Sequence, residues 1–73
     1  MKKEWWCGYD KYETREDALH ACDETDLGTA GMTWNGFDYY DRDTKESWRP
    51  VQECEVDEDG EINQCETIGY RKV

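Results

Sequence analysis

Alternation of apolar and polar positions marks the first element, residues 4–12, EWWCGYDKY. In an extended chain Trp5 and Cys7 lie on one side and Trp6 on the other, because successive side chains point to opposite faces. The segment is therefore predicted to be a strand that carries aromatic rings on both faces.

The apolar positions of residues 14–24, TREDALHACDE, follow a helical period instead. Thr14 can act as the N-cap, and Glu16 and Asp17 then place negative charge at the positive end of the helix dipole. A narrow apolar face is formed by Ala18, Leu19, Ala21 and Cys22. We predict a short helix of about three turns that packs against one side of a sheet and ends at the segment TDLGTAG.

The remaining residues have strand patterns. Residues 32–41, MTWNGFDYYD, contain Asn35 and Gly36, which either bend one strand or form a tight turn. A turn would leave very short arms, so one bent strand is favoured. Two further strands are predicted over residues 48–56 and from 61 to about 71.

The order strand, helix, strand, strand, strand predicts an α+β fold. We expect one compact domain over residues 1–73, an antiparallel sheet of about four strands with the short helix packed on one face. A chain of this length buries only about 60% of its unfolded surface, so a few large side chains must form the core. The expected core or sheet-covering rings are those of Trp5, Trp6, Trp34 and Phe37.

Residues 55–66, EVDEDGEINQCE, fit two incompatible structures. Gly60 can form a sharp turn, and oxygen ligands stand at the calcium-loop positions Glu55, Asp57, Asp59, Glu61 through its carbonyl, Asn63 and Glu66. In this spacing the segment resembles an EF-hand loop. It departs from that family at Glu55, where the family has Asp, and in its flanks, because Pro50 breaks the incoming helix and TIGYRKV is a poor outgoing one.

A β-hairpin is the favoured alternative for the same residues. Glu58 and Asp59 suit the centre of a type I turn, and Gly60 suits the left-handed residue of a bulge. Glycine reaches a positive φ without steric cost. The segment is therefore predicted to join two strands.

The hairpin register decides whether two of the four cysteines meet. A loop of two or four residues places Cys54 opposite Cys65, whereas a three-residue bulge loop pairs Val56 with Ile62 and turns the cysteines to opposite faces. The apolar pair favours the second register, so we do not predict this disulfide. An even number of cysteines also allows a two-disulfide framework. The expectation for a cytosolic protein is reduced thiols at all four, with Cys7 and Cys22 as partly buried packing groups.

Charge is the most unusual property of the chain. The net charge is −10 at pH 7, and seven of the 19 acidic residues fall between 53 and 66 with no Lys or Arg among them. Such a surface repels nucleic acid and attracts basic proteins, or it only maintains solubility. The candidate partner-binding residues are Asp38, Asp41, Asp43, Glu46, Glu53, Glu55, Asp57, Glu58, Asp59 and Glu61.

Catalytic groups are scarce. His20 is the only histidine and suits a solvated surface position, and neither a Ser-His-Asp arrangement nor a phosphate-binding glycine loop is present. We predict no enzymatic activity, no cofactor and, without a C-x-x-C pair, no metal site. No apolar run approaches the roughly 18 residues that span a bilayer, and no signal-peptide core is present, so a cytoplasmic location without membrane association is expected.

Two functions fit these features. The first is an inhibitor that occupies the basic surface of a nucleic-acid-binding protein by imitating the phosphate spacing of DNA or RNA. In size, charge and aromatic content the chain is similar to phage-encoded anti-restriction and anti-CRISPR proteins, which would place it in the host cytoplasm. The second is a small extracellular binding module, held by calcium at the loop 55–66 or stapled by disulfides.

Overall fold

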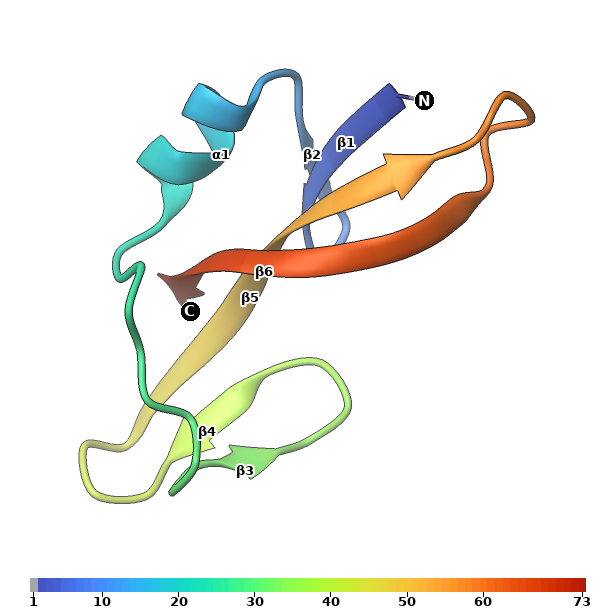
Figure 1. The fold of residues 1–73 in the computed structure, drawn as a ribbon. Coiled ribbons are helices and arrows are strands. Elements are labelled where there is room, and N and C mark those ends of the chain that lie inside the picture. The colour runs from blue at the N-terminus through green and yellow to red at the C-terminus, as the bar shows by residue number, and fades with distance from the viewer. Residues whose placement is uncertain (1) are drawn as a thin grey trace.

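The computed structural model describes residues 2–73, which form one antiparallel sheet and one helix (Figure 1). The elements are β1 (Lys2–Cys7), β2 (Asp10–Tyr12), α1 (Arg15–Ala21), β3 (Thr33–Trp34), β4 (Tyr39–Asp41), β5 (Glu46–Val56) and β6 (Ile62–Lys72). The α+β class and the short helix are confirmed. The described residues contain six strands where about four were expected, because two predicted strands are hairpins.

The first of these hairpins joins β1 to β2 through Gly8 and Tyr9. Gly8 has a φ of +62°, and Cys7 pairs with Asp10 on either side of the turn. A Cβ at Gly8 would lie 2.7 Å from the ring of Phe37. Glycine is therefore required both for the backbone conformation and for the close approach of the ring.

The second hairpin joins β3 to β4 at Asn35 and Gly36. The Oδ1 atom of Asn35 accepts hydrogen bonds from the backbone N–H groups of Phe37 and Asp38, and Gly36 has a φ of +96°. The prediction of one bent strand was wrong here. These side-chain hydrogen bonds stabilise the turn although its arms are short.

Strand β5 forms the centre of the sheet. β6 pairs with it along one edge, while β1 and β4 share the other edge, opposite Val51–Val56 and Glu46–Trp48 respectively. Figure 1 shows β5 running along the molecule from the β3–β4 hairpin to the turn that precedes β6. The two ends of β5 are thus the two ends of the molecule, whose longest extent is 43 Å.

Helix α1 begins as the sequence predicted. The Thr14 hydroxyl accepts a hydrogen bond from the Asp17 N–H at 3.1 Å. The helix has seven residues, about two turns instead of three, because Cys22 is extended and the next two residues hydrogen-bond to Tyr70 of β6. No helix within residues 2–73 has the length and apolarity that crossing a bilayer requires.

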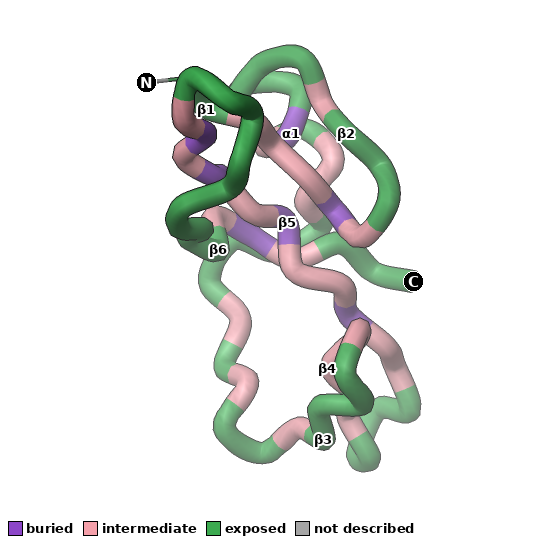
Figure 2. The backbone as a smooth tube through the Cα atoms, turned by 90° about the vertical axis from the view of Figure 1, so that its right-hand side faces the viewer, coloured by how far each residue is buried: buried purple, intermediate pink, exposed green. Residues whose placement is uncertain are grey.

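The core contains small side chains and one ring. The buried apolar residues are Cys7, Ala18, Trp48, Val51, Cys54 and Val56. Figure 2 shows buried positions on β1, α1 and β5. Of the four rings expected to form or cover the core, Trp5 is half-buried and packs against it, so the covering role is confirmed there. Trp6 and Phe37 are half-buried outside this cluster, and the expectation was wrong for Trp34, which is 50% exposed. The core cluster between β1, α1 and β5 consists of the small residues Cys7, Ala18 and Val51, and the rings of Trp5 and Tyr12 pack against it.

The β5–β6 hairpin combines both registers that the sequence allowed. Val56 pairs with Ile62 across the turn, and a bulge at residue 63 then shifts the register so that Cys54 pairs with Cys65. These two cysteines form a disulfide, whereas Cys7 and Cys22 are free. The predicted absence of this disulfide was therefore wrong, because an extra residue in one strand satisfies the apolar pair and the sulfur pair together.

Removal of the buried ring tests this core. Trp48→Ala should lower the free energy of unfolding by about 3–5 kcal/mol, because it opens a cavity beside β5. Tyr9→Ala removes a ring that is 90% exposed and should change it by less than about 0.5 kcal/mol. Urea denaturation followed by fluorescence measures both. Equal losses in the two variants would contradict the burial pattern.

The disulfide makes a second prediction. Alkylation of the denatured protein without reductant should modify two thiols, Cys7 and Cys22, and four after reduction. Reductant should lower the free energy of unfolding by about 3 kcal/mol, because it frees the loop between Cys54 and Cys65 in the unfolded chain. A variant with both of these cysteines changed to Ala should not respond to reductant. Four adducts without reductant would show that the disulfide does not form.

Candidate acidic binding surface

The two acidic clusters lie at opposite ends of β5. Residues 38–46 end at the first residue of the strand and residues 57–61 follow its last, and the ten residues between them span roughly 33 Å. Clusters on consecutive strands of a meander can lie side by side and form one continuous acidic stripe. The structure separates the two clusters, because a single long strand connects them.

The cluster at 38–46 is largely occupied by the chain's own groups. Asp38 accepts two hydrogen bonds from the Arg49 guanidinium, at 2.8 and 3.3 Å, and Glu46 forms an ion pair with Lys72. Asp41 accepts a hydrogen bond from the Asp43 N–H at 2.9 Å. Of the four acidic residues of this cluster, Asp43 is the one that is exposed, and no cationic side chain of residues 2–73 pairs with it. This end of the molecule therefore presents little free negative charge.

Glu53 lies in the interior and does not belong to an external surface. Its side chain is 8% exposed and accepts hydrogen bonds from the Trp5 indole at 2.8 Å, the Lys3 ammonium at 3.1 Å and Arg15 at 2.5 Å. The Trp5 hydrogen bond, followed by those of Lys3 and Arg15, lowers the pKa of Glu53 to about 2 against the opposing effect of burial. Glu53 thus joins β1, β5 and the start of α1.

The acidic tip, which we define as Asp57, Glu58, Asp59 and Glu61, remains as the exposed cluster. Gly60 has a φ of +86° and donates its N–H to the Asp57 carbonyl at 3.1 Å, so Glu58 and Asp59 lie at the centre of the turn. The hairpin prediction and the left-handed Gly60 are confirmed. Figure 1 shows this turn projecting beyond the rest of the sheet.

One carboxylate of the tip is structural. Asp57 Oδ1 accepts the N–H groups of Asp59 at 3.0 Å and of Glu61 at 2.9 Å. Its side chain therefore fixes the turn, while Glu58, Asp59 and Glu61 are exposed to solvent. The two backbone N–H groups that donate to Asp57 oppose the repulsion among the four carboxylates of the tip.

The strands beside the tip carry two more acidic side chains. Glu66 is exposed and Glu55 is half-buried, and both stand on the face of the hairpin that carries Glu53. Neither Lys nor Arg occurs in residues 50–70. The nearest strand, β1, does bring basic residues alongside, since Lys2 pairs with Val56 and Lys3 with Glu55.

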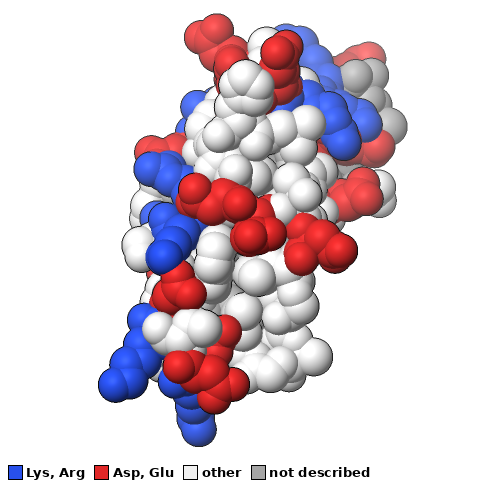
Figure 3. Space-filling model, turned by 90° about the vertical axis from the view of Figure 1, so that its left-hand side faces the viewer, with Lys and Arg blue, Asp and Glu red and all other residues white. Residues whose placement is uncertain are grey.

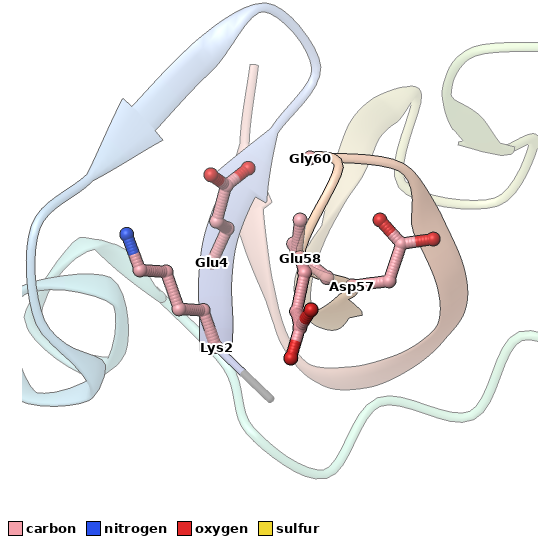
Figure 4. Close-up of a pocket in the computed structure, with 6 residues that line it drawn as sticks. Lys2, Glu4, Asp57, Glu58 and Gly60 are labelled. Atoms are coloured by element: carbon pink, nitrogen blue, oxygen red, sulfur yellow. The ribbon is translucent and has the colours of Figure 1, made fainter.

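A hollow of about 410 Å³ lies between β1 and the tip, lined by Lys2, Glu4, Val56, Asp57, Glu58 and Gly60 (Figure 4). In this view the Lys2 side chain and the Asp57 carboxylate point away from each other. Glu4 is engaged with Lys11 at 3.1 Å and with the Trp6 indole at 3.2 Å, and these bonds lower its pKa. Of the charged side chains that border the hollow, Glu4 and Asp57 already accept hydrogen bonds from other groups, and Lys2 and Glu58 are exposed to solvent.

The EF-hand positions do not converge in this geometry. The positions are spread over two strands, with Glu55 on β5 and both Asn63 and Glu66 on β6. The Asp57 carboxylate accepts hydrogen bonds from backbone N–H groups of the turn. No group of three or more His, Cys, Asp or Glu side chains in residues 2–73 is placed to hold a metal ion. Strands flank the turn where the EF-hand family has helices.

Sequence reasoning missed a second surface, on the β3–β4 hairpin. A hollow of about 260 Å³ is lined by aromatic rings and the residues beside them: Trp6, Gly8, Trp34, Gly36, Phe37, Arg49, Pro50 and Gln52. The Arg49 guanidinium lies 4.4 Å from the centre of the Phe37 ring. No local pattern signals this surface, because its residues come from separate segments of the chain.

The opposite side of the molecule has a mixed surface. Figure 3 shows the face turned away from the tip, where carboxylates lie next to lysine and arginine side chains. Arg71 pairs with Asp10 at 3.0 Å. Exposed carboxylates also lie close together at Asp23, Glu24 and Asp26, so the tip differs from these in its position on a projecting turn between two long strands.

No protein-family model matches the chain, and no curated protein or solved structure matches it. A function for this protein must therefore be argued from the chemistry of its own surface.

The Glu53 network predicts an acid-sensitive fold. Its pKa is depressed from 4.5 to about 2, so its contribution is present above pH 4.5 and is lost as the pH falls toward 2. Glu53→Gln should lower the free energy of unfolding at pH 7 on the order of 3 kcal/mol, and the difference from the parent should vanish near pH 2. Glu58→Gln, on the exposed tip, is the matched control. A Glu53→Gln effect that does not depend on pH would contradict the assignment.

Proposed function

We propose that this protein binds a basic surface of another protein through the acidic tip and thereby blocks a groove that otherwise holds nucleic acid. The observation that supports this proposal is the exposure of Glu58, Asp59 and Glu61 on a projecting turn. Carboxylates attract Lys and Arg side chains in the same way as phosphates do, and charge complementarity raises the association rate.

The construction of the tip favours binding with little loss of entropy. The two hydrogen bonds to Asp57 hold the turn, and the Cys54–Cys65 disulfide links the strands directly behind it. A group that is already ordered loses less conformational freedom on association. An acidic cluster that served only solubility would not require this rigidity.

In this proposal the protein is a non-enzymatic inhibitor of the nucleic-acid-mimic type, as phage anti-restriction and anti-CRISPR proteins are, acting in the host cytoplasm. The binding residues are the tip carboxylates, supported by Glu55 and Glu66 on the adjoining strands. Glu53, Asp38 and Glu46 are no longer included, because cations or donors of the same chain already bind their carboxylates. Asp41 and Asp43 stand at the far end of β5, too distant to share one contact with the tip.

The disulfide favours a second candidate, a secreted binding module that uses the same tip. Disulfides persist in oxidising compartments and are rare in the cytosol. Cys65 is exposed while Cys54 is buried, so the bond is accessible to reductants from one side. Calcium has no part in this candidate, because the EF-hand positions are spread along two strands.

Charge reversal tests the tip. Glu58→Lys, Asp59→Lys and Glu61→Lys in one variant should abolish binding to a basic nucleic-acid-binding protein, and the parent's affinity should fall steeply between about 50 and 200 mM salt. Asp57 is left intact because it holds the turn. Duplex nucleic acid should compete for the same groove. Binding across a panel of such proteins can be measured by isothermal titration calorimetry.

The matched control reverses three exposed charges away from the tip and outside α1, Glu13→Lys, Asp26→Lys and Asp43→Lys, and so has the same net charge. It should retain binding if the tip is the site. Equal loss in both variants would show that only the overall charge matters. Binding that is indifferent to salt would direct attention to the aromatic hollow around Trp34 instead.

A further inference from the structure

The outer edge of β6 is unpaired over half of its length. Within residues 2–73 no strand pairs with that edge between Ile62 and Thr67, and all six of these residues are exposed. Backbone N–H and C=O groups on such an edge can pair with another chain. The unpaired part begins directly beside the acidic tip.

The chain itself already pairs with the other half of this edge. The Tyr70 N–H donates to the Glu24 carbonyl at 2.7 Å, and the Tyr70 carbonyl accepts from Asp23 at 2.8 Å and from Glu24 at 3.1 Å. Asp23 also accepts the Lys72 N–H on its carboxylate at 2.7 Å. This bridge is antiparallel. The outer edge of β6 therefore accepts an extended segment, and the contact made by residues 23 and 24 ends before Thr67.

The pairing of the cysteines shows which backbone groups point outward. The Cα atoms of Cys54 and Cys65 are 4.0 Å apart, the short spacing of an antiparallel pair that exchanges no backbone hydrogen bonds. The N–H and C=O of Cys65 must then point away from β5, to the open edge. Because backbone direction alternates along a strand, the N–H and C=O of Thr67 point outward as well. Ile68 is an extra residue in β6, so the next outward-pointing residue is Tyr70, whose hydrogen bonds to Asp23 and Glu24 are observed.

Of the features that normally protect an edge strand, the open part of β6 has a bulge at residue 63 and the charged Glu66 but lacks Lys and Pro. Proteins discourage such pairing with Lys or Pro on the edge. From Val51 to Tyr70 the chain has no Lys, Arg or Pro, and β6 contains Ile62, Asn63, Gln64, Cys65, Glu66 and Thr67 in its open part. The disulfide fixes this part to β5, so an incoming strand meets an ordered template.

We propose that a basic, extended segment of the partner protein adds to β6 as an antiparallel strand and hydrogen-bonds to Cys65 and Thr67. This inference rests on the proposed function, since it assigns the same partner a second contact. Lys or Arg residues of that strand would stand beside Glu66 and near Glu55 on one face of the sheet, where opposite charges on neighbouring strands attract. A second copy of this chain fits less well, because each copy carries a net charge of −10.

Nuclear magnetic resonance tests the proposal with a short synthetic peptide of alternating lysine and threonine. With free peptide at about ten times its Kd, amide exchange at Cys65 and Thr67 should slow by about tenfold. A peptide of the same sequence with alternate amides N-methylated has the same charge but cannot complete the pairing, and it should leave these two amides unchanged.

A proline substitution isolates the backbone contact. Thr67→Pro removes an N–H that points outward, so the ladder to β5 persists, and it should weaken peptide binding by about tenfold. Thr67→Val keeps the N–H and should bind as the parent does. Circular dichroism and the Cys54–Cys65 bond establish that each variant is folded.

The alternative outcomes separate the two proposals. Peptide-induced shifts confined to the tip, with Thr67→Pro binding as tightly as the parent, would overturn strand addition and leave the charge-based function standing. Equal binding of the N-methylated peptide would overturn strand addition too. Absence of binding by either peptide to folded protein would also overturn strand addition, whereas the charge-based function is tested by the charge-reversal experiment. Protection of Cys65 and Thr67 that rises with protein concentration alone would identify a second copy as the occupant and overturn the basic partner.

Discussion

Because β5 is hydrogen-bonded along both edges, every other element of the molecule is positioned by it. β6 follows one edge, and β1 and β4 occupy successive parts of the other. The buried residues Val51, Cys54 and Val56 all lie on β5. A domain of this size has little stability to spare. A disturbance of β5 therefore affects the core, the acidic tip and the edge of β6 at once.

The acidic residues fall into two groups with opposite effects on the fold. Glu53, held by Trp5, Lys3 and Arg15, stabilises it, whereas the exposed tip carboxylates repel one another. The fold therefore does not explain the presence of the tip. The hairpin behind the tip is rigid, because a disulfide joins its strands and the bulge at residue 63 lets the sulfur pair and the apolar pair coexist. A charged tip and an open strand edge on one such hairpin can contact a partner through side chains and backbone together.

Local patterns in the sequence account for the features that depend on neighbouring residues. The Thr14 cap, the turn at Gly60 and the strand character of both long segments follow from hydrogen bonds and dihedral preferences within a few positions. The sequence also showed where acidic residues concentrate. It could not distinguish Glu53 from Glu58, because the donors that bind Glu53 are 38 to 50 positions away in the chain. The large rings were expected to form the core, because local patterns do not reveal how closely β1, β5 and α1 pack.

The cysteine pair, the separation of the acidic clusters and the open edge of β6 depend on tertiary contacts instead. A single extra residue in β6 changes which side chains face each other, and the energy of such a bulge depends on both strands and on what covers them. The length of β5 holds the two clusters far apart. The edge is open because the segment after α1 pairs at Tyr70 and goes no further, which depends on where the helix packs. Preferences of neighbouring residues can be recognised in the sequence, but contacts between distant segments depend on how the whole chain packs.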